Sequence, residues 1–300
     1  MTIRDLRICF EGHEIAVLSA NEHIDEPAII FIPGVLAPVN FWLACLPEAI
    51  LQNRRWYAIS LPGHHPSKVP NNYKPEDVNE AWLNRLYQSV IFQLEGDNKV
   101  VLVGHSTGGF SALNLASDNV MDILGVISIA GFFEGRWGGV EGQLVKLAGL
   151  GKWAKPLFQL ALSISRRTPL LQAYLSSLLA HDQTAYNESP VTPKMLAEIQ
   201  HNMQTQDLSA LFPLFNRISD LNIFPKLSAI NIPVTIMAGS HDPVISPTQS
   251  LRLAGAIEQA NLVIFDRAGH MPFMERTQQF NYELCQSIEQ YIKPAITRGL

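Results

Sequence analysis

Cysteine is scarce in this 300-residue chain, and the patterns that cysteine-based sites require are missing. Cys9, Cys45 and Cys285 are far apart, odd in number and contain no Cys-x-x-Cys pair. They exclude a disulfide framework, and the nine histidines are scattered without the spacing of zinc ligands. We therefore expect neither a disulfide-stabilised fold nor a metal site.

Long apolar runs are also missing. No window reaches about 18 uninterrupted apolar residues, so we expect no membrane span. The first residues carry charges at Arg4, Asp5, Arg7 and Glu11, which leaves no apolar segment of the kind found in secretory signals. A cytoplasmic location is the default expectation.

The sequence has no excess of charge that would attract a nucleic acid. Charged residues make up 16% of the chain, hydrophobic residues 47%, and the net charge is −5. This composition is typical of a compact globular protein. The basic residues gather only as pairs, such as Arg54-Arg55 and Arg166-Arg167, so we expect no nucleic-acid partner.

Strands that alternate with helices are the main pattern that is present. Apolar runs and turn residues predict strands at Ile3–Phe10, Glu14–Ser19, Ala28–Ile32, Trp56–Ser60, Val100–Val103, Ile123–Ala130, Val234–Ala238 and Leu262–Asp266. Helical spacing predicts helices at Pro75–Leu94, Ser246–Glu258 and Glu275–Ile292. This alternation favours an α/β fold with a mostly parallel central sheet and helices on both faces.

One long helical stretch interrupts the alternation. Within it, six apolar residues at helical spacing predict one broad apolar helix face: Leu170, Leu171, Tyr174, Leu175, Leu178 and Leu179. An insertion between two strands lies above the carboxyl edge of the sheet, where open α/β sheets bind ligands. We predict a core domain of residues 1–131 and 228–300 and an inserted helical cap of residues 132–227.

The strongest chemical signal is a Gly-x-Ser-x-Gly motif centred on Ser106. It follows the apolar run Val100–Val103 and precedes an apolar stretch with helical character. Strand, tight turn and helix together expose a serine at a strained elbow above the sheet. Gly104 and Gly108 supply the space that this turn needs, and the Thr107 N–H is a natural oxyanion donor.

A serine nucleophile needs a base and a carboxylate that orients the base. Asp242 follows the strand Val234–Ala238, and His270 follows the strand at Leu262, so both are expected at the same sheet edge as Ser106. The order serine, aspartate, histidine is the one expected for such a triad. Glu134 is the rival for the acid and ranks well behind Asp242.

In these motifs the chain resembles the α/β-hydrolase superfamily, in the serine-nucleophile branch with a helical cap after the sixth strand. The matching motifs are Ile32-Pro33-Gly34, Ser60-Leu61-Pro62-Gly63-His64, Gly104-His105-Ser106-Thr107-Gly108-Gly109, Gly239-Ser240-His241-Asp242 and Ala268-Gly269-His270-Met271-Pro272. The resemblance implies that Ser106 attacks an acyl carbon, His270 transfers the proton and Asp242 holds the imidazolium.

The same resemblance implies that Val35 supplies the second oxyanion amide. The chain departs from the family here, because Pro33-Gly34 stands where His-Gly is usual, and the Leu36 amide is an alternative donor. His64 and His65 are expected to shape a turn, and His105 to pack, rather than to transfer protons.

The cap is the region that bears on specificity. Its aromatic residues either line an apolar pocket or form the cap's own core: Phe132, Phe133, Trp137, Trp153, Phe158, Phe212 and Phe215. Lys146, Lys152 and Lys155 lie among apolar residues, as in a helix that touches lipid, although solvated lysines explain them as well.

Three functions remain open at this point. The leading prediction is a serine esterase, of carboxylesterase or lipase type, that cleaves a small-molecule, mostly apolar ester. The same triad would also serve a thioester, lactone or carbon–carbon bond, or acyl transfer, because fold and triad do not select the bond. The third is a ligand sensor that signals through an unidentified partner protein. No cofactor is expected, since no phosphate loop or dinucleotide fingerprint occurs.

Overall fold

In residues 1–298, which the computed structural model describes, eight strands form one sheet in the order β1-β2-β4-β3-β5-β6-β7-β8. The strands are β1 (Ile3–Phe10), β2 (His13–Ala20), β3 (Ala28–Ile32), β4 (Trp56–Ile59), β5 (Val100–His105), β6 (Ile123–Ile129), β7 (Val234–Gly239) and β8 (Ala260–Phe265). Strand β2 runs antiparallel to both β1 and β4, and every later pair is parallel.

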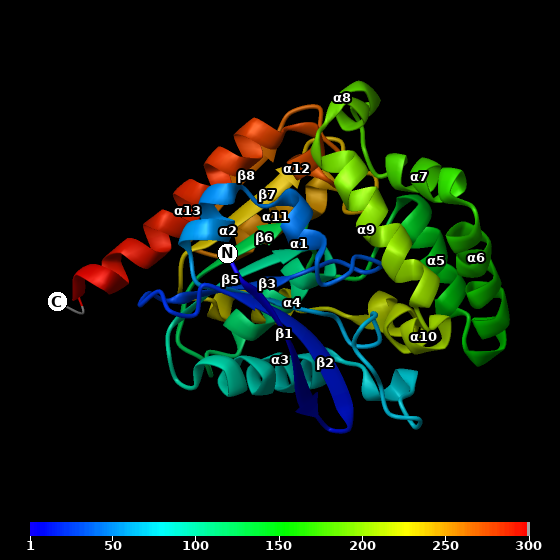
Figure 1. Ribbon diagram of the computed structural model, residues 1–300, viewed down its shortest axis with the longest axis horizontal. Helices are drawn as coiled ribbons and strands as arrows, with labels where there is room; N and C mark the ends of the chain where they lie inside the picture. Colours follow the sequence, from blue (N-terminus) through cyan, green and yellow to red (C-terminus); the bar gives the residue numbers. More distant parts are fainter. Residues whose placement is uncertain (299–300) are drawn as a thin grey trace.

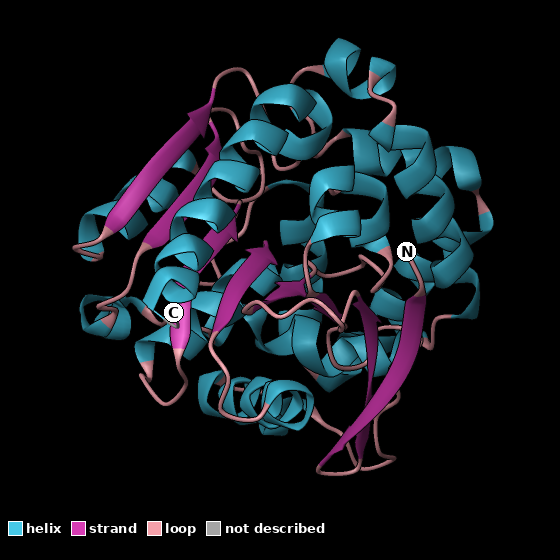
Figure 2. Cartoon of the chain, turned by 60° about the vertical axis from the view of Figure 1, so that its left-hand side comes forward, coloured by secondary structure: helices cyan, strands magenta, loops and turns pink. Residues whose placement is uncertain are grey.

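Helices cover both faces of this sheet, as Figure 2 shows. The α-helices are α1 (Phe41–Cys45), α2 (Glu48–Asn53), α3 (Glu80–Glu95), α4 (Thr107–Ser117), α5 (Gly139–Gly149), α6 (Lys155–Arg167), α7 (Pro169–Ser177), α8 (Gln183–Glu188), α9 (Val191–Thr205), α10 (Leu208–Arg217), α11 (Pro247–Ala256), α12 (Pro272–Glu275) and α13 (Thr277–Arg298). Short 3-10 helices are η1 (Pro75–Asp77), η2 (Lys152–Ala154), η3 (Ile218–Asp220) and η4 (Phe224–Ala229).

Two apolar clusters, one on each face, hold the helices to the sheet. One cluster includes Trp82 of α3, Phe110 of α4 and Leu253 of α11, and the other includes Trp42 of α1 and Leu284 of α13. Strands β3 and β5 are buried along their whole length, as expected for central parallel strands whose two faces are both covered. The α/β fold predicted from the sequence is confirmed.

Helices α5 to α10 form the inserted cap, which connects β6 to β7 and gathers at one side of the molecule (right in Figure 1). Hydrogen bonds bind the cap to the core at several places, and the buried side chains of Gln206 and Glu275 make four of them. Gln206 at the end of α9 donates to the Gly63 carbonyl (2.8 Å) and accepts from the His65 amide (2.7 Å). Glu275 of α12 accepts from the His181 and Asp182 amides (2.8 and 2.7 Å). These contacts fix the cap above the carboxyl edge of the sheet.

Two predicted helix boundaries were wrong for local reasons. The helix predicted over Pro75–Leu94 begins only at Glu80, because the Asn79 side chain accepts from the Trp82 amide (2.9 Å) and caps it. The closing helix predicted over Glu275–Ile292 is two helices, since the backbone leaves helical geometry at Arg276 (φ −135°, ψ 47°).

The apolar face predicted over residues 170–179 is divided rather than continuous. Helix α7 ends at Ser177, and Leu175 and Leu179 line a cavity. Leu170 and Tyr174 point outward and are 84% and 60% exposed. One short helix therefore presents apolar side chains to two different surroundings.

Candidate active site

Ser106 occupies a strained turn between β5 and α4. Its backbone has φ 53° and ψ −113°, a left-handed conformation that costs a non-glycine residue about 1–3 kcal/mol. Glycine is needed on both sides, because a Cβ at Gly104 would lie 2.1 Å from the Gly108 carbonyl oxygen. A Cβ at Gly108 would lie 2.0 Å from the Ile32 carbonyl oxygen. The turn raises Ser106 above the edge of the sheet, directly before the first residue of α4, Thr107.

His270 and Asp242 are joined by a buried hydrogen bond. His270 Nδ1 lies 2.8 Å from Asp242 Oδ2, and the two side chains are 1% and 2% exposed. The other carboxylate oxygen accepts from the backbone amides of Val244 and Ile245 (2.8 and 3.0 Å). These amides fix the carboxylate, so that it holds His270 in the tautomer with a proton on Nδ1 and a lone pair on Nε2.

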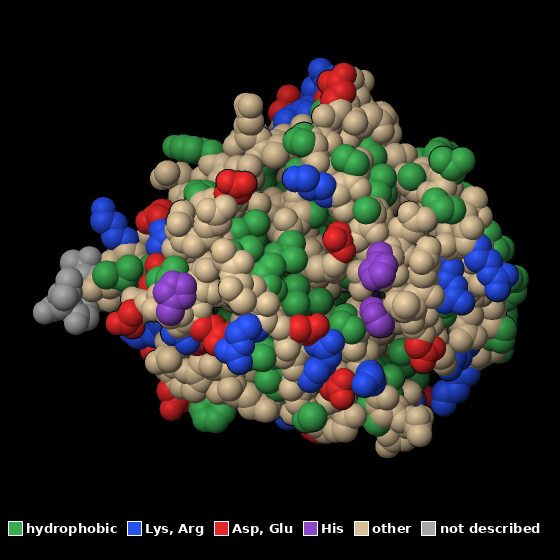
Figure 3. All heavy atoms as spheres, in the orientation of Figure 1, with side chains coloured by type: hydrophobic (Ala, Val, Ile, Leu, Met, Phe, Trp, Pro, Cys, Tyr) green, Lys and Arg blue, Asp and Glu red, His purple; other side chains and the backbone are tan. Residues whose placement is uncertain are grey.

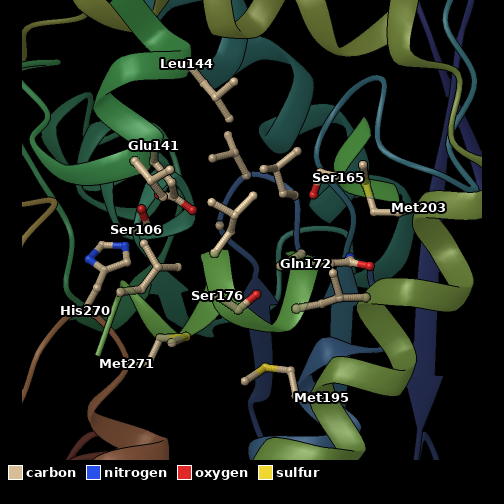
Figure 4. A pocket seen from close by; sticks show the side chains of 18 of the residues that line it. Ser106, Glu141, Leu144, Ser165, Gln172, Ser176, Met195, Met203, His270 and Met271 are labelled. Carbon is tan, nitrogen blue, oxygen red and sulfur yellow. The ribbon is translucent and has the colours of Figure 1, made fainter. Parts of the chain in front are cut away.

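Ser106 and His270 line the same cavity, and each has a reactive atom that is buried and unpaired. Among the side chains that the structure describes, Ser106 Oγ and His270 Nε2 have no hydrogen bond partner. Figure 4 shows both side chains at one end of the cavity. The structure therefore brings all three residues of the predicted triad to one place, although they follow three different strands, β5, β7 and β8.

The loop after β3 is held by a histidine that the sequence analysis assigned only to a turn. The Leu36 amide donates to His64 Nε2 (3.1 Å), and His64 Nδ1 donates to the Pro62 carbonyl (3.2 Å). Burial lowers the pKa of His64 to about 4, so that the ring stays neutral and Nε2 accepts. The Leu36 amide, which the sequence analysis considered as an alternative oxyanion donor, is therefore already engaged within the protein.

His105 and Glu134, which the sequence analysis also considered, make other contacts. His105 Nε2 bonds to the backbone carbonyl of His270 (3.1 Å), and its ring stacks on Phe41. Burial lowers the pKa of His105 to about 3, which keeps it neutral. Glu134 forms ion pairs with Arg136 and Arg252, both at 3.6 Å, and does not bond to His270.

The cavity above Ser106 has a volume of about 380 Å³ and is mostly apolar. Core residues such as Val35 and Met271 form one side, and Leu144, Leu162 and Met195 of the cap form the other. None of the cap aromatic residues proposed from the sequence lines it. Six of them are buried in apolar packing within the protein, and Trp153 is 67% exposed.

Two acidic residues at this site were not identified from the sequence. Glu141 of α5 lines the cavity. Glu275 accepts from the Gly269 amide (2.8 Å), next to His270, with the oxygen that does not bind the cap. The sequence carried no signal for either residue, because both reach the site through the packing of distant helices.

Comparison with known proteins agrees with the observed fold. The family model described as alpha/beta hydrolase fold matches residues 27–277. The chain therefore belongs to the α/β-hydrolase family and is a hydrolase. Residues 1–298 contain no helix with the length and hydropathy needed to cross a bilayer.

Individual relatives are distant. A putative carbamate hydrolase, RutD of Escherichia coli, is 21% identical over 90% of this chain and 93% of its own length. An enol-lactonase from Burkholderia xenovorans has 20% identity and a TM-score of 0.72, covering 94% of this chain and 98% of the other. A putative aryl esterase from Burkholderia cenocepacia has 21% identity and a TM-score of 0.74, covering 96% and 99%.

Proposed function

We propose that this protein is a serine hydrolase in which Ser106 is the nucleophile, His270 the general base and Asp242 the orienting acid. The observation that carries the proposal is the buried His270–Asp242 hydrogen bond, 2.8 Å long, in the cavity that also holds the unpaired Ser106 hydroxyl. The strained backbone at Ser106 supports the same role.

In this mechanism Ser106 Oγ attacks the carbonyl carbon while its proton passes to His270 Nε2. The amides of Val35 and Thr107 donate to the carbonyl oxygen as it becomes negative. The tetrahedral intermediate collapses, and the leaving alcohol takes the proton from His270. Water then attacks the acyl-enzyme, gives a proton to His270, and releases the acid as Ser106 recovers its hydrogen.

The substrate class that we propose is a mostly apolar carboxylic ester of small to medium size. The apolar lining and the volume of about 380 Å³ support it, since such pockets bury much of a small ligand. The printed names of the relatives include an aryl esterase, an enol-lactonase and a carbamate hydrolase. All these bonds have an acyl carbon that a serine can attack, so lactones are the second candidate.

We also propose that the chain divides into a core domain of residues 1–131 and 228–300 and a cap of residues 132–227. In this division the core supplies Ser106, Asp242 and His270. The cap supplies most of the apolar side chains over them and so selects the substrate.

Two measurements on the wild-type protein test the proposed function. A fluorophosphonate probe should label Ser106 covalently, which mass spectrometry of a digest can locate. A panel of p-nitrophenyl esters of increasing acyl length, thioesters and lactones should give the highest kcat/KM for an apolar ester. If the probe labels Ser106 but a lactone gives the highest kcat/KM, the triad assignment stands and the proposed substrate class is wrong. If Ser106 is not labelled, the proposed mechanism is refuted.

The pH dependence of kcat/KM should follow the ionisation of His270. Burial lowers the pKa of this imidazole, but the charge and hydrogen bond of Asp242 outweigh burial and raise it above its ordinary value of 6.5. His270 must be neutral to accept a proton, so activity should fall with decreasing pH through a midpoint above 6.5. A rate that stays constant down to pH 5.5 would contradict this assignment.

Replacing His64 with alanine should weaken transition-state stabilisation. The change leaves the Leu36 amide without its buried acceptor, so the neighbouring Val35 amide loses its fixed direction. We expect kcat to fall by about 10- to 100-fold with a smaller change in KM. His65→Ala is the matched control and should stay near wild type. Equal losses in both variants would mean that His64 does not act through this loop.

A further inference from the structure

Glu141 is a buried carboxyl group that the proposed triad does not use. It lies in the first turn of α5 and is 8% exposed, and its side chain lines the cavity together with Ser106 and His270. In Figure 4 the Glu141 side chain lies at the Ser106 end of the cavity, while Ser165 and Gln172 lie farther away. Its position is therefore next to the bond that would be cleaved.

Within residues 1–298, the Oε2 atom of Glu141 is buried and has no hydrogen bond partner. A buried polar atom without a partner destabilises the fold, and an apolar side chain would suit neighbours such as Leu144 better. Burial raises the pKa of Glu141 to about 7. Because the buried, unpaired carboxyl group of Glu141 destabilises the fold and lies beside the nucleophile, it indicates a function in ligand binding.

We propose that Glu141 accepts a hydrogen bond from a neutral hydroxyl or N–H group that the substrate carries close to its scissile carbonyl. The proposal rests on the proposed function and defines its substrate more closely. The preferred ester would thus have an apolar body, which fills the cap side of the cavity, and one donor beside the acyl carbon.

A neutral donor fits this site better than a cation. The rest of the cavity is mostly apolar, so a permanent charge would lose its hydration without full compensation. Glu141 is only partly ionised near neutral pH. A hydroxyl or N–H group can donate to either ionisation state of the carboxyl, which keeps one lone pair available in both.

Three matched esters test this on the wild-type protein: one with a hydroxyl on the carbon next to the carbonyl, its methyl ether and its deoxy form. We expect kcat/KM for the hydroxy ester to exceed both others by about 10- to 100-fold, the range for a hydrogen bond to a charged group. The methyl ether has no donor, so equal rates for the hydroxy ester and the ether would overturn the proposal.

Two variants of Glu141 separate this role from a general effect on catalysis. Glu141→Leu should lose the preference for the hydroxy ester, and Glu141→Gln should retain part of it, since its amide oxygen still accepts. Gln143→Leu, which also lines the cavity from α5, is the matched control and should keep the full preference. A similar loss on all three esters would make Glu141 a modulator of His270 and refute the proposal.

Fluorophosphonate labelling distinguishes the two levels of failure. If the wild-type Ser106 is not labelled and no ester is cleaved, the proposed function fails. If Ser106 is labelled and all three esters react alike, only the inference about Glu141 fails.

A separate observation concerns the outer surface of the cap. Helices α6 and α7 and the preceding η2 expose large apolar side chains, each 50–84% exposed: Trp153, Leu157, Leu160, Ile164, Leu170 and Tyr174. Four of them, at positions 153, 157, 160 and 164, recur at helical spacing and form one outward face. We call these four residues, together with Leu170 and Tyr174, the cap face. An exposed apolar patch of this kind marks an interaction site.

Basic residues predominate around the cap face, although Glu76 pairs with Lys152 (3.3 Å) and Asp207 lines a surface hollow together with Leu160. Residues 142–181 contain no aspartate or glutamate, and their charged side chains are all basic: Lys146, Lys152, Lys155, Arg166 and Arg167. Figure 3 shows basic and hydrophobic side chains next to each other over the region of α6 and α7 (right). This segment is positive although the whole chain has a net charge of −5.

We infer that the cap face binds the surface of a lipid bilayer that contains anionic lipids. Apolar side chains at helical spacing with basic residues beside them are typical of helices that lie in the membrane interface. The inner sides of α6 and α7, at Leu162 and Leu175, line the cavity. An apolar ester dissolved in the bilayer would thus lie a single helix layer away from Ser106.

Sedimentation with vesicles tests this inference. The full chain should bind vesicles of phosphatidylcholine with phosphatidylglycerol at least 10-fold more tightly than phosphatidylcholine alone, and 0.5 M salt should weaken the binding. The double variant Leu157→Ser, Ile164→Ser should lose it, while Phe92→Ser, which changes an exposed apolar side chain of α3, should not. Binding unaffected by the double variant, or dimerisation through the cap face in place of vesicle binding, would overturn the inference.

Discussion

Ser106→Ala is expected to lower kcat/KM for the best ester by about 10⁵- to 10⁶-fold, which is the largest effect predicted for this protein. The hydroxyl is the atom that would form the acyl-enzyme, and alanine offers no substitute. The substitution removes one oxygen from a buried site and leaves the turn glycines in place, so the fold should persist. Steady-state kinetics and fluorophosphonate labelling measure the two losses together.

The control for this experiment is a buried serine on α4, the helix that follows Ser106. Ser111 of α4 donates to the Thr107 carbonyl (3.0 Å) and does not line the cavity. Ser111→Ala should therefore remain within a few-fold of wild type. If Ser106→Ala kept most of the turnover, or if both variants lost it equally, Ser106 would not be the nucleophile.

Asp242→Asn is expected to lower kcat by about 10³- to 10⁴-fold with little change in the fold. The asparagine oxygen can still accept from the amides of Val244 and Ile245. Its NH₂ group would then face His270 Nδ1 and favour the tautomer with the proton on Nε2, which cannot accept the Ser106 proton. The carboxylate charge that raises the pKa of His270 would also be lost, so the pH midpoint of residual activity should decrease.

The rival acid provides the matched control for this variant. Glu134 pairs with Arg136 and Arg252 at the surface side of the cap junction. Glu134→Gln should retain nearly full activity. If Glu134→Gln lost as much as Asp242→Asn, the proposed assignment of the acid would be wrong.

Much of the fold was predictable because its signals are local. The apolar runs at Ala28–Ile32 and Val100–Val103 form central strands, and the glycines around Ser106 identify a turn that only glycine can accommodate. Since parallel strands present their carboxyl ends at one edge, the positions of Asp242 and His270 after two such strands implied that they would lie near Ser106.

The features that were missed depend on packing between distant segments. Glu141 resembles any exposed acidic residue near a helix start, and nothing in the sequence indicates that α5 turns it into the cavity. The aromatic residues of the cap show the opposite error, because residues considered for the pocket are buried in the packing of the protein instead. Phe158 and Phe215 pack on each other in the cap (5.1 Å between ring centres), and hydropathy does not distinguish a core ring from a pocket ring.

The carboxylate of Glu275 helps to couple the loop that carries His270 to the cap segment between α7 and α8, which the His270 amide also contacts through the Leu179 carbonyl (2.8 Å). One oxygen binds the amide next to His270, and the other binds the amides that lead from α7 into α8. Thermal loosening of that cap segment would release the backbone of the histidine as well. Inactivation on warming should therefore precede the loss of sheet structure, as two transitions at different temperatures.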